Sequence, residues 1–213
     1  MLNTVLKIIY PSFCRSCSSI TDQEQIFCFA CQSKIKPVVP IFLPLAKKYV
    51  IPVHAVCAYA DPVKSLIFKK FSYDTLACKQ LANLMFDFVP FEAIKADFLI
   101  PVPLHWTRYA WRGYNQTELI AKQLSKKLDT PVLNIVKRKN RTIFQSKLNS
   151  EQRQKNVEKA FALRDGNDTS IKDKTVIIID DLFTTGATVK NVAKLLATLQ
   201  PTSIYIAVAC RAI

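Results

Sequence analysis

Residues 176–189 read VIIIDDLFTTGATV, and this stretch decides the fold class. The run from Val176 to Ile179 is aliphatic without alternation, which is typical of a strand covered by helices on both faces of a parallel sheet. In such sheets ligands bind just beyond the carboxyl ends of the strands, where no helix covers the backbone. Asp180 and Asp181 directly follow the run, so we expect both carboxylates at the ligand-binding edge.

The segment after the acidic pair has the composition of a phosphate site. Small residues lead into the apolar pattern of residues 189–199, which places backbone N–H groups at a helix N-terminus, where partial positive charge favours an anion. A glycine in the turn lets the backbone approach a ligand, and threonine hydroxyls add hydrogen bonds. The two carboxylates would bind sugar hydroxyls or Mg²⁺. The predicted cradle consists of Thr184, Thr185, Gly186, Ala187 and Thr188 beside Asp180 and Asp181.

Two other interpretations fit an apolar strand followed by acidic residues. P-loop NTPases hold Mg²⁺ with such a strand, but they need the motif GxxxxGK[ST], and this chain has only Gly113, Gly166 and Gly186. That interpretation is excluded. A plain strand, turn and helix with Thr184 as the N-cap remains open.

The stretch DDLFTTGATV resembles the phosphoribosyl pyrophosphate (PRPP) binding motif of type I phosphoribosyltransferases, which has two acids followed by a short T-T-G-x-T loop. The resemblance implies a parallel sheet with flanking helices and a site for PRPP together with Mg²⁺.

The composition indicates a folded protein with anionic partners. The 213 residues are 50% hydrophobic, enough for one core and a small appendage. The net charge is +14, and residues 105–160 carry 13 Lys and Arg against 4 Asp and Glu. Such a concentration of charge favours binding to nucleic acid, pyrophosphate or a membrane surface, although a merely soluble basic protein remains an alternative.

The chain has no predicted membrane span, since no apolar run approaches the ~18 residues that a spanning helix needs. Residues 2–9 have apolar side chains at helical spacing but lack the cleavage site of a signal peptide, so we expect a short amphipathic helix and a cytoplasmic protein.

Four of the seven cysteines form two C-x-x-C knuckles in tandem, which favours a closed structural Zn²⁺ site. Disulfides are disfavoured in a reducing compartment, and a redox C-x-x-C normally occurs singly. The predicted ligands are Cys14, Cys17, Cys28 and Cys31. The other three, Cys57, Cys78 and Cys210, fit buried small apolar positions.

The chain divides into a predicted zinc module with an N-terminal helix (residues 1–50) and a predicted phosphoribosyltransferase-like domain (residues 51–213). The proline-rich segment 36–52 reads as a stiff connector between them. We expect strands at 53–59, 97–103, 132–136, 175–180 and 203–209, and helices at 63–71, 76–88, 116–128 and 189–199. Asn115 is a candidate N-cap. The alternation predicts an α/β fold with a parallel sheet.

Two basic segments join the predicted site. The loop in residues 101–116, PVPLHWTRYAWRGYNQ, contains Arg108, Arg112 and Gly113. These residues suit a pyrophosphate, because one arginine guanidinium can bind two phosphate oxygens at once and glycine allows a tight turn. The aromatic residues between them would stack on nucleobases or pack beneath the loop. We expect residues 137–155 to form a mobile loop over the site, although a solvated loop without a role is the alternative. The predicted nucleic-acid contacts are Lys137, Arg138, Lys139, Arg141, Lys147 and Arg153.

Taken together, these motifs resemble the ComF family of competence proteins. The likeness includes the four cysteines, PVPLHWTRYAWRGYNQ, IIIDDLFTTGATV and a run defined by Arg138, Arg141, Gln145, Leu148, Arg153 and Asn156. The resemblance implies a role in natural transformation, with single-stranded DNA and PRPP as ligands and a helicase-type ATPase as a partner.

If the phosphoribosyltransferase chemistry operates, pyrophosphate leaves the anomeric carbon of PRPP. Asp180 and Asp181 would hold the ribose, Arg108 and Arg112 would stabilise the leaving group with Mg²⁺, and the cradle would bind the 5′-phosphate. The sequence shows no base pocket and no clear general base, because His54 falls in a predicted core strand and His105 in a loop. A phosphoribosyltransferase of nucleotide salvage and a scaffold with a vestigial cradle therefore remain open.

Overall fold

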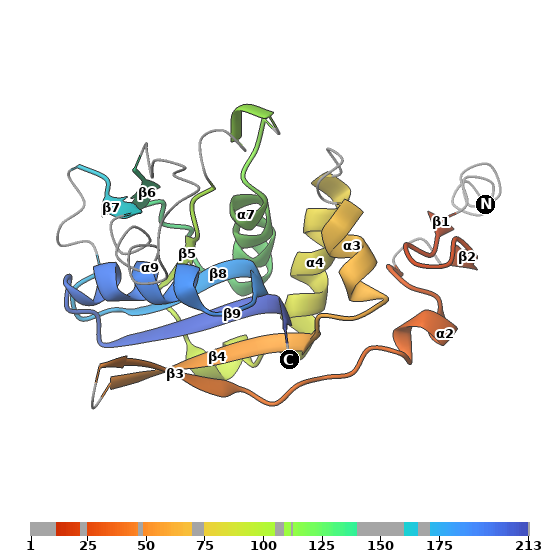
Figure 1. Ribbon diagram of the computed structural model, residues 1–213, viewed down its shortest axis with the longest axis horizontal. Coiled ribbons are helices and arrows are strands. Elements are labelled where there is room, and N and C mark those ends of the chain that lie inside the picture. Colours follow the sequence, from red (N-terminus) through yellow and green to blue (C-terminus); the bar gives the residue numbers. More distant parts are fainter. Residues whose placement is uncertain are drawn as a thin grey trace, which may run out of the picture.

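A five-stranded sheet forms the centre of the protein (Figure 1). The computed structural model describes residues 12–21, 25–46, 49–69, 75–104, 109–111, 113–139, 160–165 and 171–212. The strand order is β3-β4-β9-β8-β5. Strands β4, β9, β8 and β5 run parallel, and β3 pairs antiparallel with β4 at the edge. The strands are β3 (Ile41–Ala46), β4 (Tyr49–Ala58), β5 (Phe98–Pro101), β8 (Thr175–Phe183) and β9 (Ser203–Arg211).

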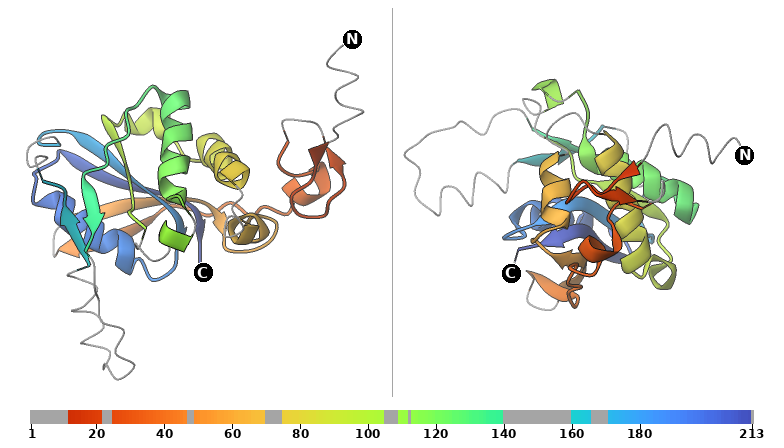
Figure 2. Two further views of the ribbon diagram at one scale, coloured as in Figure 1. Left: turned by 90° about the horizontal axis from the view of Figure 1, so that it is seen from above. Right: turned by 90° about the vertical axis from the view of Figure 1, so that its right-hand side faces the viewer.

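Helices cover both faces of the sheet, as the aliphatic run predicts. Ile177 and Ile179 of β8 belong to the core on the side of α4 and α7, whereas Val176 and Ile178 belong to the core on the side of α9. The left view of Figure 2 shows α4 and α7 on one side of the sheet and α9 on the other. The main helices are α3 (Val63–Lys69), α4 (Thr75–Phe88), α7 (Gln116–Leu128) and α9 (Ala187–Ala197), with a short α5 (Phe91–Ile94).

The proline-rich segment is not the connector that the sequence predicts, because part of it is strand. Pro44 lies in β3 at the edge of the sheet, and Pro52 precedes Val53, where β4 begins to pair with β9. Proline is tolerated at such positions because no ladder hydrogen bond is lost. The sheet therefore includes residues that precede the expected boundary near residue 50, and the division of the chain into two domains remains a prediction.

One further strand expectation was wrong in extent. The strand expected at 132–136 is reduced to a single bridge between Val132 and Leu99. The chain instead enters β6 (Val136–Arg138), which pairs antiparallel with β7 (Phe161–Leu163). The buried side chains of Val136 and Phe161 fix this ribbon to the core on the α9 side.

The N-terminal cysteine module, here residues 12–35, lies at the end of the molecule nearest α3 and α4 (Figure 1). It contains β1 (Ser12–Phe13), β2 (Ile20–Thr21) and α2 (Phe29–Gln32). Ile26 and Phe27 belong to the same buried cluster as Leu84 of α4, so apolar packing joins the module to the helices. The amphipathic helix expected at residues 2–9 lies outside the described residues. Within the described ranges, no helix is both long and apolar enough to cross a bilayer.

Candidate functional site

The TTG loop, here residues 184–188, turns the chain sharply from β8 into α9. Gly186 is the N-cap of α9 and has φ +74° and ψ 0°, a left-handed conformation that disfavours every residue with a side chain. A Cβ at this position would lie 2.6 Å from Cζ and 2.9 Å from Cε2 of Phe183, and 3.4 Å from Cδ1 of Leu43. Backbone conformation and space therefore both require glycine here.

The turn leaves backbone donors open. Among the described residues, the N–H groups of Thr184, Thr185 and Gly186 donate to no backbone carbonyl. The N–H of Ala187 donates to Oγ1 of Thr185 over a long 3.4 Å, and the threonine side chains at 184 and 185 are exposed. Thr188 is half-buried in the first turn of α9. An anion at this helix N-terminus would meet several N–H groups that no other backbone group uses.

The acidic pair lies inside β8 rather than at its end, which differs from the sequence-based expectation. β8 continues through Leu182 and Phe183, which pair with Cys210 and Arg211 of β9. On the other side of β8, the last residue that pairs with β5 is Ile179, so Asp180 and Asp181 lie beyond the end of β5. The carboxyl edge is thus stepped, because β9 reaches further than β5.

The two carboxylates leave the strand in different directions. Successive side chains of a strand point to opposite faces, and Asp180 pairs with Val208, which belongs to the core on the α9 side. Asp180 therefore lies on the same face as α9, and Asp181 on the face of α4 and α7. Only 9% of Asp180 is exposed, whereas Asp181 is half-buried. The N–H of Asp181 donates to Oδ1 of Asp180 at 2.9 Å, which fixes the orientation of that carboxylate.

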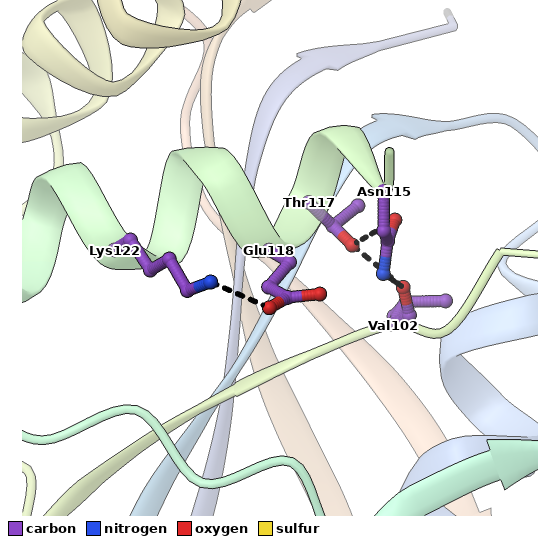
Figure 3. Close-up of polar contacts among 5 residues, drawn as sticks. All are labelled: Val102, Asn115, Thr117, Glu118 and Lys122. Atoms are coloured by element: carbon purple, nitrogen blue, oxygen red, sulfur yellow. Dashed lines mark hydrogen bonds and ion pairs between the residues drawn. The ribbon is translucent and has the colours of Figure 1, made fainter. Parts of the chain in front are cut away.

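The loop after β5 is anchored at both ends beside the acidic pair. The N–H of Val102 donates to the carbonyl of Ile179 at 3.0 Å. The carbonyl of Val102 accepts from Nδ2 of Asn115 at 3.2 Å and from the buried hydroxyl of Thr117 at 2.6 Å (Figure 3). Asn115 occupies the predicted N-cap position but makes no capping bond, because its side chain is used to close this loop.

The predicted arginines of that loop, Arg108 and Arg112, lie outside the described residues. Its described aromatic residues divide into two groups. Tyr109 and Trp111 are 51% and 60% exposed, whereas Tyr114 packs against the core. Tyr114 therefore has the packing role, which was one of the two roles that the sequence left open for these rings.

The basic segment is not a loop at its start, contrary to expectation. Lys137 and Arg138 lie in β6, and the N–H of Lys139 donates to Ala160 beside β7. Lys137 pairs with the exposed Asp165 at 3.2 Å, and the guanidinium of Arg138 lies 5.4 Å from the ring centre of Phe161. An exposed ion pair of this kind is weak, so Lys137 can exchange its partner. Three further predicted contacts, Arg141, Lys147 and Arg153, lie outside the described residues.

The four cysteines of the module converge as the spacing predicts. Their Sγ atoms all lie within 4.8 Å of one another, and those of Cys17 and Cys28 are 3.6 Å apart. Tetrahedral Zn²⁺ with bonds of about 2.3 Å would need sulfur separations of roughly 3.8 Å, so the donor set fits a zinc ion. The cluster of Cys14, Cys17, Cys28 and Cys31 could hold a metal such as zinc.

The thiols of the cluster differ in their electrostatic environment. Hydrogen bonding to Ser19 lowers the pKa of Cys17 to about 6, which favours the thiolate that binds metal. Burial raises the pKa of Cys31 to about 11. Because metal binding deprotonates thiols, a bound cation would offset that effect of burial.

Some residues that shape the site were missed by sequence reasoning. Phe183 and Leu43 enforce the glycine at 186, and Thr117 secures the loop after β5. Phe183 lies within the quoted motif and its apolar character is visible there. Leu43 could not be found from sequence, because it reaches the loop through the pairing of distant strands.

Comparison with known proteins agrees with this architecture. The Phosphoribosyl transferase domain family matches residues 116–213, which include β8, the TTG loop and α9. The chain is 36% identical to Competence protein F of Haemophilus influenzae over 148 residues, which are 66% of this chain and 64% of that protein. The match thus spans just under two thirds of the Haemophilus protein.

Two other relatives are matched over more of their length. The chain is 26% identical to Competence protein ComFC of Bacillus subtilis over 81% of this chain and 78% of that protein. It is 31% identical to DNA utilization protein YhgH of Escherichia coli O6:H1 over 73% of this chain and 70% of that protein.

Solved phosphoribosyltransferases are more distant. An adenine phosphoribosyltransferase from Thermoanaerobacter pseudethanolicus gives a TM-score of 0.42 at 16% identity, covering 86% of this chain and 98% of that one. A purine phosphoribosyltransferase from Pyrococcus horikoshii gives 0.37 at 21% identity, covering 61% and 68%. These likenesses are loose, and the fold assignment depends on the family match and the sheet topology.

The mostly parallel sheet, its flanking helices and the family match define a phosphoribosyltransferase-type fold, preceded by a four-cysteine cluster. The chain belongs to the ComF family.

Proposed function

We propose that this protein acts in natural transformation, where it handles incoming single-stranded DNA in the cytoplasm and binds PRPP, or a related phosphoribosyl ligand, at the TTG loop. The observation that carries the proposal is the loop itself. Gly186 turns the chain into α9, and the N–H groups of the loop donate to no backbone carbonyl among the described residues, directly after a strand that bears Asp180 and Asp181.

Three groups of residues would each bind a different part of PRPP. The N–H groups and hydroxyls of the TTG loop would bind the 5′-phosphate. Asp180, oriented by the N–H of Asp181 and on the α9 side, would accept hydrogen bonds from ribose hydroxyls, and Asp181 would do so from the other side of the strand. Carboxylate oxygens also suit Mg²⁺, which neutralises pyrophosphate charge when bound. Arg108 and Arg112 would bind the pyrophosphate.

The DNA part of the proposal is supported by the relatives and by surface chemistry. Relatives are named for competence and for DNA utilization. Tyr109 and Trp111 expose aromatic rings on which bases can stack, and Lys137 to Lys139 supply positive charge on the β6–β7 ribbon. Single-stranded DNA bound along this surface could be passed to or from a helicase-type ATPase, which we propose as a partner.

A phosphoribosyltransferase of nucleotide salvage is the second candidate, favoured by the family match of residues 116–213. It would need an acceptor and a base. His54 is not placed as that base, because it lies in β4 against Tyr205, with ring centres 6.3 Å apart. Release of pyrophosphate from PRPP in the presence of a panel of bases or amines would support a phosphoribosyltransferase of nucleotide salvage. If no pyrophosphate is released, the protein binds PRPP without turning it over.

The DNA proposal is tested by charge reversal on the ribbon. Replacing Lys137, Arg138 and Lys139 together by Glu should weaken binding to all single-stranded sequences alike. The binding constant K falls with salt, and each lost phosphate contact makes the slope of log K against log salt shallower by about 0.7. Loss of three contacts should therefore make it shallower by roughly 2. Fluorescence anisotropy across a salt series measures both effects.

The matched control reverses three exposed lysines elsewhere, Lys79, Lys95 and Lys126, and so changes the net charge equally. It should leave the slope close to that of the wild type. Equal effects of the two triple variants would mean that only net charge matters and would reject the ribbon as a DNA contact.

A further inference from the structure

Buried polar side chains are few in the described part of this protein, and two of them lie together at the start of α7. The buried polar or charged residues of the described ranges are Gln116, Thr117 and Asp180. A buried hydroxyl is unfavourable unless it makes a hydrogen bond. Only 5% of Thr117 is exposed, and its hydroxyl donates to the carbonyl of Val102 at 2.6 Å (Figure 3). The side chain of Thr117 is therefore tied to one backbone carbonyl.

Val102 is the residue at which three elements meet. Pro101 is the last residue of β5 that pairs with β8, and its partner is Ile179. Just beyond this pair, the N–H of Val102 donates to the carbonyl of Ile179 at 3.0 Å. The carbonyl of Val102 accepts from the start of α7, through the hydroxyl of Thr117 and through Nδ2 of Asn115 at 3.2 Å. One residue thus joins the end of β5, the strand β8 and the start of α7.

Asn115 takes part in this junction instead of capping its helix. It is the N-cap residue of α7, but its side chain makes no capping bond, although a capping asparagine ordinarily stabilises a helix. Its Nδ2 donates to Val102, and its Oδ1 lies 2.9 Å from the hydroxyl of Thr117. A side chain that could stabilise α7 is used to hold Val102, which is expected where a functional site requires one position of the backbone.

The junction is one residue away from the acidic pair. Ile179 directly precedes Asp180, whose Oδ1 accepts from the N–H of Asp181 at 2.9 Å. Asp180 is buried, so its carboxylate can move little unless the backbone of β8 moves. The TTG loop begins further along the chain, after Phe183, and is shaped there by the contact between Phe183 and Gly186. A displacement of Val102 would therefore reach the acidic pair before it reached the TTG loop.

We propose that Thr117 is a positioning residue for the acidic pair, which it holds in place through the backbone of Val102 and Ile179. This inference rests on the proposed function, because it concerns a ligand that has a ribose as well as a phosphate. Thr117 acts through the backbone and does not contact the ligand. It raises the affinity for PRPP, whose ribose would bind the carboxylates, and leaves unchanged the affinity for inorganic phosphate, which needs only the TTG loop.

The test replaces Thr117 by valine, which removes the hydroxyl and keeps a branched side chain of similar size. Calorimetry measures the binding of PRPP with Mg²⁺ and of inorganic phosphate. The variant should bind PRPP roughly three- to tenfold more weakly than the wild type, the effect of one neutral hydrogen bond, and should bind phosphate equally well. Because Asn115 still donates to Val102, the variant should keep its fold. Thr117→Ser retains the hydroxyl and should restore most of the PRPP affinity.

The matched control is Thr198→Val, because the hydroxyl of Thr198 also donates to a backbone carbonyl, that of Leu195 at 2.7 Å, but at the far end of α9. It should leave the binding of both ligands unchanged. Unchanged PRPP binding in Thr117→Val, or equal weakening of PRPP and phosphate binding, would overturn the inference alone. A wild type that binds phosphate but no PRPP would overturn the proposed function, and the inference with it, before any variant is compared.

Discussion

Replacing Gly186 by alanine is expected to abolish detectable PRPP binding and to lower the free energy of unfolding by about 2–5 kcal/mol. A left-handed conformation costs a residue with a Cβ about 1–2 kcal/mol, and overpacking adds about 1–3 kcal/mol. The new Cβ would meet the ring of Phe183 at 2.6 Å, and Phe183 is itself buried and cannot withdraw freely. Relief of this contact would move the TTG loop, and its N–H groups would lose their arrangement. Urea denaturation and PRPP titration measure the two effects.

Gly113 provides a matched control for the stability effect. It has the same φ of +74°, but a Cβ there would meet no atom within 4 Å. Gly113→Ala should therefore lower the free energy of unfolding by only about 1–2 kcal/mol, the backbone contribution alone. Equal destabilisation by the two substitutions would contradict the contact between residue 186 and Phe183.

Replacing Cys31 by serine is expected to remove zinc from the purified protein and to unfold the cysteine module. Four thiolates hold a structural zinc with an apparent free energy of about 10–16 kcal/mol in small zinc-binding peptides, and this energy is also folding energy. The described residues of the module form only two strands of two residues and a helix of four, so these elements add little other stabilisation. Atomic absorption should fall from one zinc per chain to a small fraction.

Cys78→Ala is the control for the zinc prediction, since Cys78 is buried in α4 away from the cluster. It should retain one zinc per chain. Full zinc content in Cys31→Ser, or equal loss in both variants, would show that the four cysteines are not the metal site. Because Ile26 and Phe27 pack with α4, loss of the module should also lower the melting temperature of the whole protein.

The centre of the fold could be predicted from sequence because its signals are local. The aliphatic run of β8 and the small residues around Gly186 indicate a buried strand and a turn into a helix, and both are confirmed. The bounds of α7 at 116–128, which the candidate N-cap Asn115 and the amphipathic pattern predict, are confirmed. The convergence of four cysteines follows from the two knuckles.

The remaining features depend on contacts between distant residues. Ile41–Ala46 became strand because β4 pairs with it, although its proline suggested a connector. Lys137 and Arg138 became strand because Phe161–Leu163 pairs with them, and their charges suggested a loop. The extension of β8 past the acidic pair depends on pairing with the last strand of the chain. None of these partners can be identified from the local pattern.

The central claim is that the TTG loop and its acidic pair bind a phosphoribosyl ligand, and one calorimetric titration tests it most directly. PRPP with Mg²⁺ should give a saturable heat with one site per chain. Asp181→Asn should weaken this binding by about 5- to 10-fold, because a hydrogen bond to a charged group is replaced by one to a neutral amide. Two results together would contradict the account. One is that PRPP produces no heat with the wild type at several temperatures, and the other is that PRPP does not displace inorganic phosphate from the protein.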